Sequence, residues 1–386
     1  MSKDKRETVY YVCYYAEPDF SGDIVSYPSV WSKINYVSDC IKKNGFDICY
    51  VCPVMPLHGR FRKREVQIDE HEKHVYFSAY RNPNWRISQI LNGIAQILQI
   101  LTFLLKNQKK MDRILIYHSM FHVQWTWILH YVFRRQFLLE IEDVYSALSP
   151  KGKCFEKKEW RFFESASGYL CVNSLICDKI NNPAPKIISH GRYAIPEIIE
   201  EKETAKCRLV YAGVIEQVRN GAFLAVEAML CLPADYELII LGFGKESDIA
   251  DLRTLIEKVN YEKGWECIHY LGYMSGETYL RELQKCSIAL STHMYDDSNM
   301  KSADYTFPSK LLVYMANGLN IVAQNLECLR TSDISDYIYY YESPTPKAVA
   351  EAVLDVDTNR QCDSRRWIEK LDREFVEGLK RILLDM

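Results

Sequence analysis

The chain has 386 residues, of which 48% are apolar and 26% charged, and its formal net charge is −3. This length and composition exclude a single small domain, a disordered chain and a fibrous protein. Residues 1–200 hold 27 Lys and Arg against 21 Asp and Glu, whereas residues 201–386 hold 21 against 30. A basic first half suits an anionic partner such as a phospholipid surface or a lipid-linked diphosphate, with solvated surface charge as the simpler alternative.

Short apolar strands alternate with helices through the first half of the chain. This alternation predicts a parallel sheet that is covered by helices on both faces. A charged stretch with several prolines follows, and we interpret it as the end of this domain and a linker. The strands are expected at 8–16, 46–54, 74–80, 113–119, 136–145 and 168–174, and the helices at 29–45, 86–106, after 119 and around 155–166.

The helix expected at 86–106 is the most apolar one, but it is interrupted by Gln89, Asn92, Gln96 and Gln99 on one face. Ile90, Ile94, Ile97, Leu101 and Leu104 recur at spacings of three and four. We therefore predict an amphipathic helix and no membrane span. Docking of its apolar stripe on the sheet of its own domain is the expected role, and a position in a membrane interface is the alternative.

A second alternating series fills the rest of the chain. Strands are expected at 207–215, 236–244, 267–273, 287–292 and 320–324, with helices between them and a last helix within 363–386. The fold class is therefore α/β, with two doubly wound Rossmann-like domains that face each other across a cleft. We expect the domains at 1–190 and 207–360, a linker at 191–206, and a C-terminal helix at 361–386 that packs back towards the first domain.

Thirteen cysteines are scattered singly through apolar stretches, which suits a reducing cytoplasm. Cys49 and Cys52 form a CxxC pair, but without a second pair at ligand spacing we expect no zinc site. No signal peptide is visible, so the expected location is the cytoplasm, with peripheral contact at the inner face of the cytoplasmic membrane. The basic clusters follow no nucleic-acid-binding pattern, and we expect no nucleic acid partner.

Several runs resemble one enzyme family in their order and spacing. They are Leu209–Gly213, Leu241–Gly244, Leu271–Tyr273 and Phe307–Lys310 in the second half, and His118–Ser119, Leu139–Asp143, Gly168–Asn173 and Ser189–Gly191 in the first. Together they resemble the group 1 (family four) retaining glycosyltransferases of the GT-B fold, over essentially the whole chain. The resemblance implies transfer of a sugar, with retention, from a nucleoside diphosphate sugar to a glycan or lipid-linked glycan in capsular, exo- or lipopolysaccharide synthesis.

Phosphate chemistry gives the motifs of the second half a physical reason. Negative charge grows on the leaving diphosphate as the glycosidic bond breaks, so cations and backbone N–H groups are needed there. Arg219 and Lys310 are the expected catalytic cations, and Lys310 in a first helical turn opposes the helix dipole unless an anion offsets it. A surface role for Arg219 is the alternative. The expected donor-binding residues are Gly213, Arg219, Gly242, Tyr273, Phe307, Pro308, Ser309 and Lys310, with Tyr273 near the base or in the core.

Strand ends of the first half carry His118, Glu140 and Asp143. The resemblance implies that His118 contacts the transferred sugar as a third catalytic residue, and a hydrogen-bonded structural histidine is the alternative. Glu140 and Asp143 are the acceptor-side candidates, because a carboxylate there could orient an acceptor hydroxyl; capping a helix is the other interpretation.

The sequence departs from the family at Tyr305 and Val313, where a pair of glutamates is usual, and Asp304 or Glu327 could substitute. Two other functions therefore remain: a nucleotide-sugar 2-epimerase of the same fold, and a non-catalytic subunit that binds a sugar nucleotide. No metal motif stands out, so we expect no metal and no cofactor beyond the donor substrate.

Overall fold

The computed structural model describes residues 6–16, 22–25, 28–81, 86–149, 151–198, 206–217, 221–295, 300–357 and 363–386. The chain divides into two compact units. Unit 1 comprises Met1–Arg192 together with Arg373–Met386, and unit 2 comprises Tyr193–Asp372. Unit 1 thus also contains the end of the last helix.

Unit 1 is built on an eight-stranded sheet and a separate two-stranded pair. The strands are β1 (Thr8–Val12), β2 (Asp47–Cys52), β3 (Gly59–Phe61), β4 (Arg64–Gln67), β5 (Glu72–Tyr76), β6 (Ala79–Arg81), β7 (Arg113–Tyr117), β8 (Leu138–Ile141), β9 (Gly168–Cys171) and β10 (Lys186–Ile188). The large sheet has the order β10-β9-β8-β7-β1-β2-β5-β4, and β3 pairs with β6. Neighbours run parallel except the edge pair β4–β5 and the pair β3–β6.

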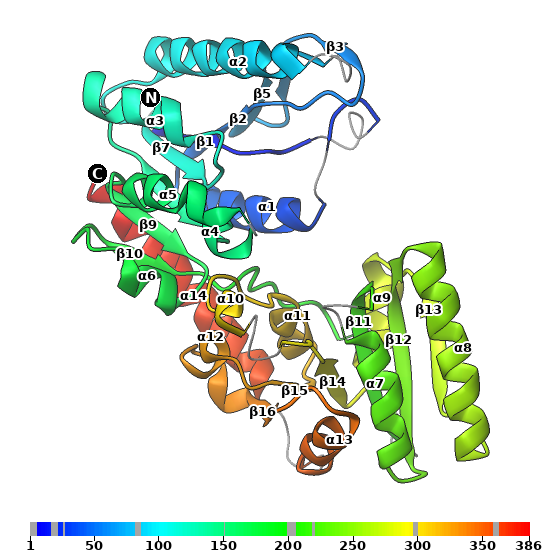
Figure 1. Cartoon of the computed structure of the whole chain (residues 1–386). Helices are drawn as coiled ribbons and strands as arrows, with labels where there is room; N and C mark the ends of the chain where they lie inside the picture. Colours follow the sequence, from blue (N-terminus) through cyan, green and yellow to red (C-terminus); the bar gives the residue numbers. More distant parts are fainter. Residues whose placement is uncertain are drawn as a thin grey trace. The chain divides into compact units, whose positions relative to one another are not determined.

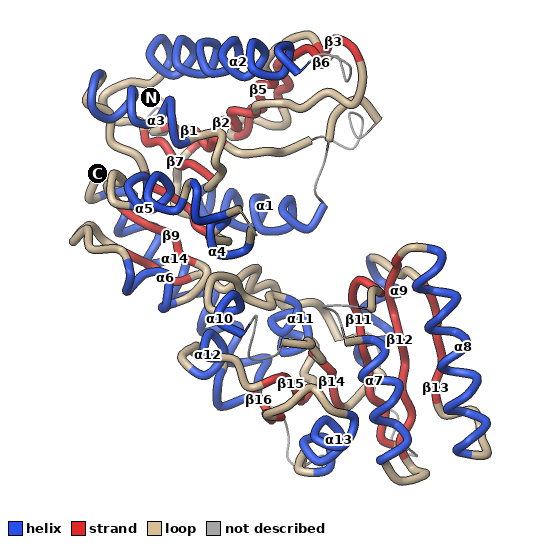
Figure 2. The backbone as a smooth tube through the Cα atoms, in the orientation of Figure 1, coloured by secondary structure: helices blue, strands red, loops and turns tan. Residues whose placement is uncertain are grey.

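Helices cover both faces of this sheet (Figures 1 and 2). Every residue of β7 is buried, which requires cover on both sides because strand side chains alternate in direction. β1 lies between β2 and β7, so the loops after β1 and β7 flank the switch point of the sheet. The helical segments are α1 (Pro28–Lys43), α2 (Arg86–Asn107), α3 (Val123–Trp127), the π-helix η2 (Ile128–Val132), α4 (Tyr145–Leu148), η3 (Gly152–Cys154), α5 (Glu156–Phe163) and α6 (Ser174–Lys179).

The amphipathic helix is present as α2, but only part of its expected stripe docks on the sheet. Leu101 and Leu104 are buried. Ile90 and Ile94, by contrast, are 65% and 51% exposed. The expected docking is therefore wrong for the first half of the helix.

Unit 2 has a six-stranded sheet in the order β13-β12-β11-β14-β15-β16, parallel throughout. Its strands are β11 (Cys207–Ile215), β12 (Tyr236–Gly244), β13 (Ile268–Gly272), β14 (Ile288–Ser291), β15 (Asn320–Gln324) and β16 (Ile338–Tyr341). Its helices are α7 (Ala222–Ala228), η4 (Met229–Cys231), α8 (Glu246–Lys263), α9 (Gly276–Gln284), α10 (Met300–Ala303), α11 (Lys310–Ala316), α12 (Glu327–Arg330), η5 (Ser335–Tyr337) and α13 (Pro346–Leu354). The doubly wound architecture expected of both halves is confirmed.

The last helix, α14 (Ser364–Leu384), takes part in both units. At its start, Ser364 Oγ donates a 3.0 Å hydrogen bond to the carbonyl of Met315 in unit 2. Near its end, the carbonyl of Leu383 accepts a 2.7 Å hydrogen bond from Nε of Arg113 in unit 1.

Candidate functional site

The loops after β11 and β14 lie at the switch point of the unit 2 sheet, because β11 pairs with β12 on one side and with β14 on the other. Ligands of doubly wound sheets bind at this place. Gly221 lies directly before α7 and contacts the residue after β14: the carbonyl of Gly221 accepts a 2.7 Å hydrogen bond from Thr292 Oγ1. A Cβ at Gly221 would lie 1.5 Å from the carbonyl oxygen of Thr292. Only glycine can therefore hold the start of α7 this close to the end of β14.

Gly213 and Gly242 are register partners at the carboxyl ends of β11 and β12. Gly242 has a φ of +153°, and a Cβ there would lie 1.9 Å from the carbonyl oxygen of Gly213. A Cβ at Gly213 would lie 3.8 Å from Lys310 Nζ. The two expected donor-binding glycines thus keep this strand end free of side chains beside a cation, which allows a ligand close to the backbone.

Lys310 begins α11, and its Nζ lies 4.8 Å from the ring centroid of Tyr211. Lys310 is partly buried, and this burial lowers its pKa to about 8. A buried charge is costly unless an opposite charge or hydrogen-bond acceptors compensate it. This cation beside Gly213 is therefore suited to meeting an anion.

A small cavity of about 150 Å³ lies at the carboxyl ends of β14 and β15 and is lined by Phe307 and Pro308, among others. Both were expected donor-binding residues. Ser309, the third, precedes α11 but forms no side-chain cap hydrogen bond and is exposed. The helix start at Lys310 is thus present, and the side chain of Ser309 does not cap it.

His293 lines the same cavity, and the sequence analysis did not identify it. Its Nδ1 lies 3.3 Å from Ser291 Oγ. Burial, and then the charge of Lys310, lower the pKa of His293 to about 3, so the ring is neutral at pH 7. A single histidine two residues beyond a strand carries no motif, and its proximity to Lys310 follows only from the fold.

Tyr273 follows β13 and is 67% exposed. Its ring contacts that of Phe243, itself 55% exposed, edge to face with centroids 5.6 Å apart. The alternative of a core tyrosine is therefore wrong. Two exposed rings at the carboxyl ends of β12 and β13 offer a surface on which a planar base can stack.

Arg219, the other expected cation, lies outside the described residues. The proposed substitutes for the missing glutamates are described: Asp304 and Glu327 both act on Cys328, whose pKa burial and these charges raise to about 12. Cys328 lines the cavity of about 150 Å³, so both carboxylates lie near it. Tyr305 and Val313 are partly buried.

In unit 1, a pair of carboxyl groups, one fully buried and one partly exposed, lies at the carboxyl end of β8 near β1. The Tyr11 hydroxyl donates to Glu140, whose side chain is fully buried. Burial and the charge of Glu142 raise the pKa of Glu140 to about 8. Lys33 Nζ lies 3.4 Å from Glu142 and donates to the carbonyl of Ser189 at 2.6 Å. Glu140 is therefore inaccessible to an acceptor, whereas Glu142 is 18% exposed.

His118 follows β7, the strand next to β8, and 1% of its side chain is exposed. Its Nδ1 is 3.0 Å from the carbonyl oxygen of Asp143, and its Nε2 is 3.3 Å from Glu159 Oε1 without hydrogen-bond geometry. Glu159 in turn accepts hydrogen bonds from the backbone N–H groups of Tyr145 and Ser146. Burial lowers the pKa of His118 to about 3. This geometry is that of a structural histidine, while Asp143 remains partly exposed.

A cavity of about 240 Å³ adjoins the switch point of unit 1 and was not anticipated from the sequence. Tyr14 lines it from the segment after β1, Val54 from that after β2, and Phe121 from that after β7. Within the described ranges, no group of three or more His, Cys, Asp or Glu side chains is placed to hold a metal ion.

No protein-family model and no curated protein sequence matches the chain. Solved structures do match it over nearly its full length. The lipopolysaccharide outer core galactosyltransferase WaaB in its apo form has a TM-score of 0.62 at 12% identity and covers 98% of this chain and 99% of its own. A structure described as trehalose-6-phosphate from E. coli bound with UDP-2-fluoro glucose has a TM-score of 0.63 at 10% identity, covering 98% of both chains. Anabaena Alr3699/HepE in complex with UDP has a TM-score of 0.58 at 10% identity, covering 97% and 100%. The fold of this chain is therefore the GT-B glycosyltransferase fold with two Rossmann-like domains.

Proposed function

We propose that this chain is a glycosyltransferase that moves a sugar from a nucleoside diphosphate sugar to a glycan or lipid-linked glycan in capsular, exo- or lipopolysaccharide synthesis. The observation that carries the proposal is the partly buried Lys310 ammonium group beside the glycine-lined end of β11. Structures of the same fold hold UDP or UDP-2-fluoro glucose, which supports a uridine or other nucleoside diphosphate as the donor's leaving group.

In this proposal, Lys310 and Arg219 face the diphosphate and stabilise the charge that grows on it during bond breakage. These cations replace a metal ion. The base stacks near Tyr273 and Phe243, and the resemblance implies retention at the anomeric carbon. Asp143 is the acceptor-side carboxylate, because Glu140 is fully buried. His118 acts as a positioning residue for the Asp143 turn, through its contact with the carbonyl of Asp143.

Isothermal titration of the protein with UDP, GDP, ADP and CDP tests the donor site. One nucleotide should bind, and Lys310→Ala should weaken it about 10- to 150-fold, the loss of a charged hydrogen bond of about 1.5–3 kcal/mol. Arg219→Ala should act in the same direction. Lys285→Ala is the matched control, since Lys285 forms a surface pair with Glu282 on α9. Wild-type affinity in both the Lys310 and Arg219 variants would refute the phosphate site.

Product analysis separates the alternatives. A glycosyltransferase releases the nucleoside diphosphate faster when an acceptor is added, and it does so in EDTA if cations replace the metal. A 2-epimerase would change the sugar without an acceptor. A non-catalytic subunit would bind the donor and leave it intact.

A further inference from the structure

The polar face of α2 points into unit 1. Gln96 is 4% exposed and binds both backbone groups of Val54: its Oε1 accepts from the N–H at 2.8 Å, and its Nε2 donates to the carbonyl at 2.9 Å. Gln99 binds both backbone groups of Ser78 in the same way, at 3.1 Å each. These amides satisfy backbone groups just beyond β2 and β5, so the orientation of the helix is fixed.

The apolar face of the same helix points away from the protein. Five large aliphatic side chains are each more than half exposed: Ile87, Ile90, Leu91, Ile94 and Leu98. Their positions i, i+3, i+4, i+7 and i+11 place them on one face, which we call the α2 stripe. The helix runs along the outside of unit 1 (Figure 1). A helix of a globular protein has the opposite arrangement, and a continuous exposed apolar face indicates a binding surface.

The part of the chain that contains the α2 stripe is almost free of acidic residues. Between residues 86 and 139 the sequence has one carboxylate, Asp112. It is 8% exposed and accepts hydrogen bonds from the backbone N–H groups of Thr8 and Lys109. Lys106 and Lys110, at and beyond the end of α2, are exposed. An apolar face bordered by lysines is the pattern that anionic lipid surfaces attract.

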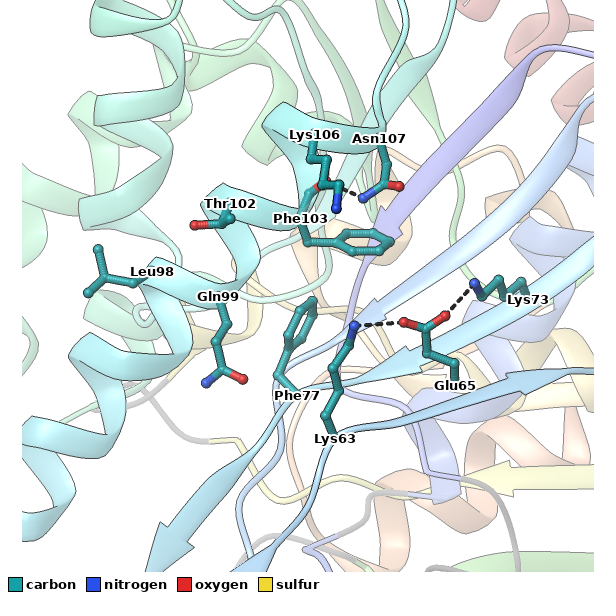
Figure 3. A pocket seen from close by; sticks show the side chains of 10 residues that line it. All are labelled: Lys63, Glu65, Lys73, Phe77, Leu98, Gln99, Thr102, Phe103, Lys106 and Asn107. Carbon is teal, nitrogen blue, oxygen red and sulfur yellow. Dashed lines mark hydrogen bonds and ion pairs between the residues drawn. The ribbon is translucent and has the colours of Figure 1, made fainter.

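A hollow of about 450 Å³ lies beside the end of the stripe and brings further lysines to it. Figure 3 shows Leu98 and Thr102 of α2 at its rim, with Lys63 and Lys73 bound to Glu65 across it. Those two ion pairs measure 2.6 and 2.5 Å. Lys106 has no carboxylate partner among the described residues. Three lysines against one glutamate leave the hollow cationic, which suits a lipid phosphate.

We propose that unit 1 binds an anionic phospholipid bilayer through α2, which lies in the plane of the interface with the α2 stripe among the lipid chains and its lysines against the phosphates. A second copy of the chain is a poorer occupant, because it would bring the same cationic surface into contact with itself. Docking on a bilayer would bring the enzyme to a lipid-linked acceptor, and only this functional interpretation rests on the proposed function. The membrane binding itself does not depend on it.

By length and composition α2 could also cross a membrane: the most apolar 18 residues within Ile87–Asn107 have a mean hydropathy of 1.5, and 28% of those residues are buried. Crossing would withdraw Gln96 and Gln99 from Val54 and Ser78 and leave amide and backbone groups unpaired in lipid. The inferred orientation is therefore parallel to the bilayer.

Co-sedimentation of the full chain with vesicles, without nucleotide or acceptor, tests the proposal. The protein should bind vesicles of 3:1 phosphatidylcholine and phosphatidylglycerol and dissociate from them as the salt concentration rises. It should not bind vesicles of pure phosphatidylcholine at high salt. Ile90→Ser with Ile94→Ser should lower the partition coefficient at least tenfold, and Lys106→Ser with Lys110→Ser should reduce its salt dependence. Tyr261→Ser with Leu354→Ser, on exposed apolar positions of unit 2, is the matched control.

A second measurement does not depend on the folding of a double variant. In Ile94→Trp, lipids brominated near the headgroup should quench a larger part of the fluorescence than in the wild-type protein, which has seven tryptophans, and Tyr261→Trp should show no such increase. Equal binding by the serine pair and its control, quenching of Ile94→Trp no greater than that of the wild-type protein, or resistance of the bound protein to alkaline carbonate would each overturn the in-plane docking. So would light scattering that shows a dimer dissociated by the serine pair. Nucleotide affinity should stay unchanged in all stripe variants, so failure here leaves the donor site standing.

Discussion

Glu140 is the residue whose ionisation is most strongly tied to the fold of unit 1. It is fully buried, receives the Tyr11 hydroxyl, and lies near Glu142 and Lys33. Burial and the neighbouring charge of Glu142 raise the pKa of Glu140 to about 8. With Glu140 protonated, the pair of carboxyl groups carries one negative charge, which matches the single positive charge of Lys33.

Glu140→Gln should flatten the dependence of stability on pH. The native state holds a proton up to about pH 8, whereas an unfolded glutamate releases it near its ordinary pKa. The free energy of unfolding of the wild-type protein should therefore fall as pH rises from about 5 to 9, by a few kcal/mol. Glutamine cannot titrate, so the variant should lose that decline. Urea unfolding at several pH values measures it, with exposed Glu277→Gln as the control; identical profiles for Glu140→Gln and wild type would contradict this account.

At the level of single residues, the sequence predicted which side chains lie near one another better than it predicted which of them are exposed to solvent. Lys310 lies beside Gly213 as the phosphate argument required, because a strand-turn-helix pattern fixes which backbone ends meet. His118 was assigned to the sugar, but α4 and α5 bury it through Tyr145, Phe162 and Phe163. His293 was missed because a single histidine beyond a strand carries no motif, and its proximity to Lys310, 17 residues later, follows only from the fold.

Among the elements, the position of α7 depends on a glycine, Gly221, directly before its first residue. Gly221→Ala places a methyl group 1.5 Å from the carbonyl oxygen of Thr292, so the backbone must shift at the switch point. Overpacking of this kind costs about 1–3 kcal/mol. We expect a lower Tm and weaker nucleotide binding together. Gly22→Ala, where no atom lies within 4 Å, should change neither. A Gly221→Ala protein with the wild-type Tm would show that α7 is not held there.

Periodicity predicted which segments are helices and which are strands. It did not predict which face of a helix packs against the sheet. The expected strand at 74–80 is divided into β5 and β6, because the backbone of Ser78 turns to Gln99 and leaves the ladder. Likewise, the pattern of α2 defines a polar and an apolar face but not which one meets the sheet. Gln96 and Gln99 decide that through backbone hydrogen bonds that no propensity scale contains.

At the scale of the whole molecule, α14 completes the core of unit 1 from the far end of the chain. Phe375 stacks on Tyr36 with ring centroids 5.5 Å apart, and a Cβ added at Gly168 would lie 2.8 Å from Ile382 Cδ1. The exposed fraction of Leu379 is zero. The end of the C-terminal helix thus forms part of the core of unit 1.

Leu379→Ala should destabilise unit 1 by about 2–5 kcal/mol, the cost of a buried leucine and its cavity. Leu384→Ala, on the same helix but 58% exposed, should cost almost nothing. Hydrogen exchange should detect the loss in β8 and β9, while the amides of β11 and β12 keep their protection. Equal protection of unit 1 in both variants would mean that the end of α14 contributes little to its stability.

The return of α14 to unit 1 also sets the order in which the protein can be completed during translation. Arg113 and Tyr36 leave the ribosome long before Leu383 and Phe375, their partners in unit 1, have been synthesised. Unit 2 has nearly all its residues earlier, since it ends at Asp372. The first unit to be made is therefore the last to be finished, and until then the groove that α14 fills stays open to chaperones.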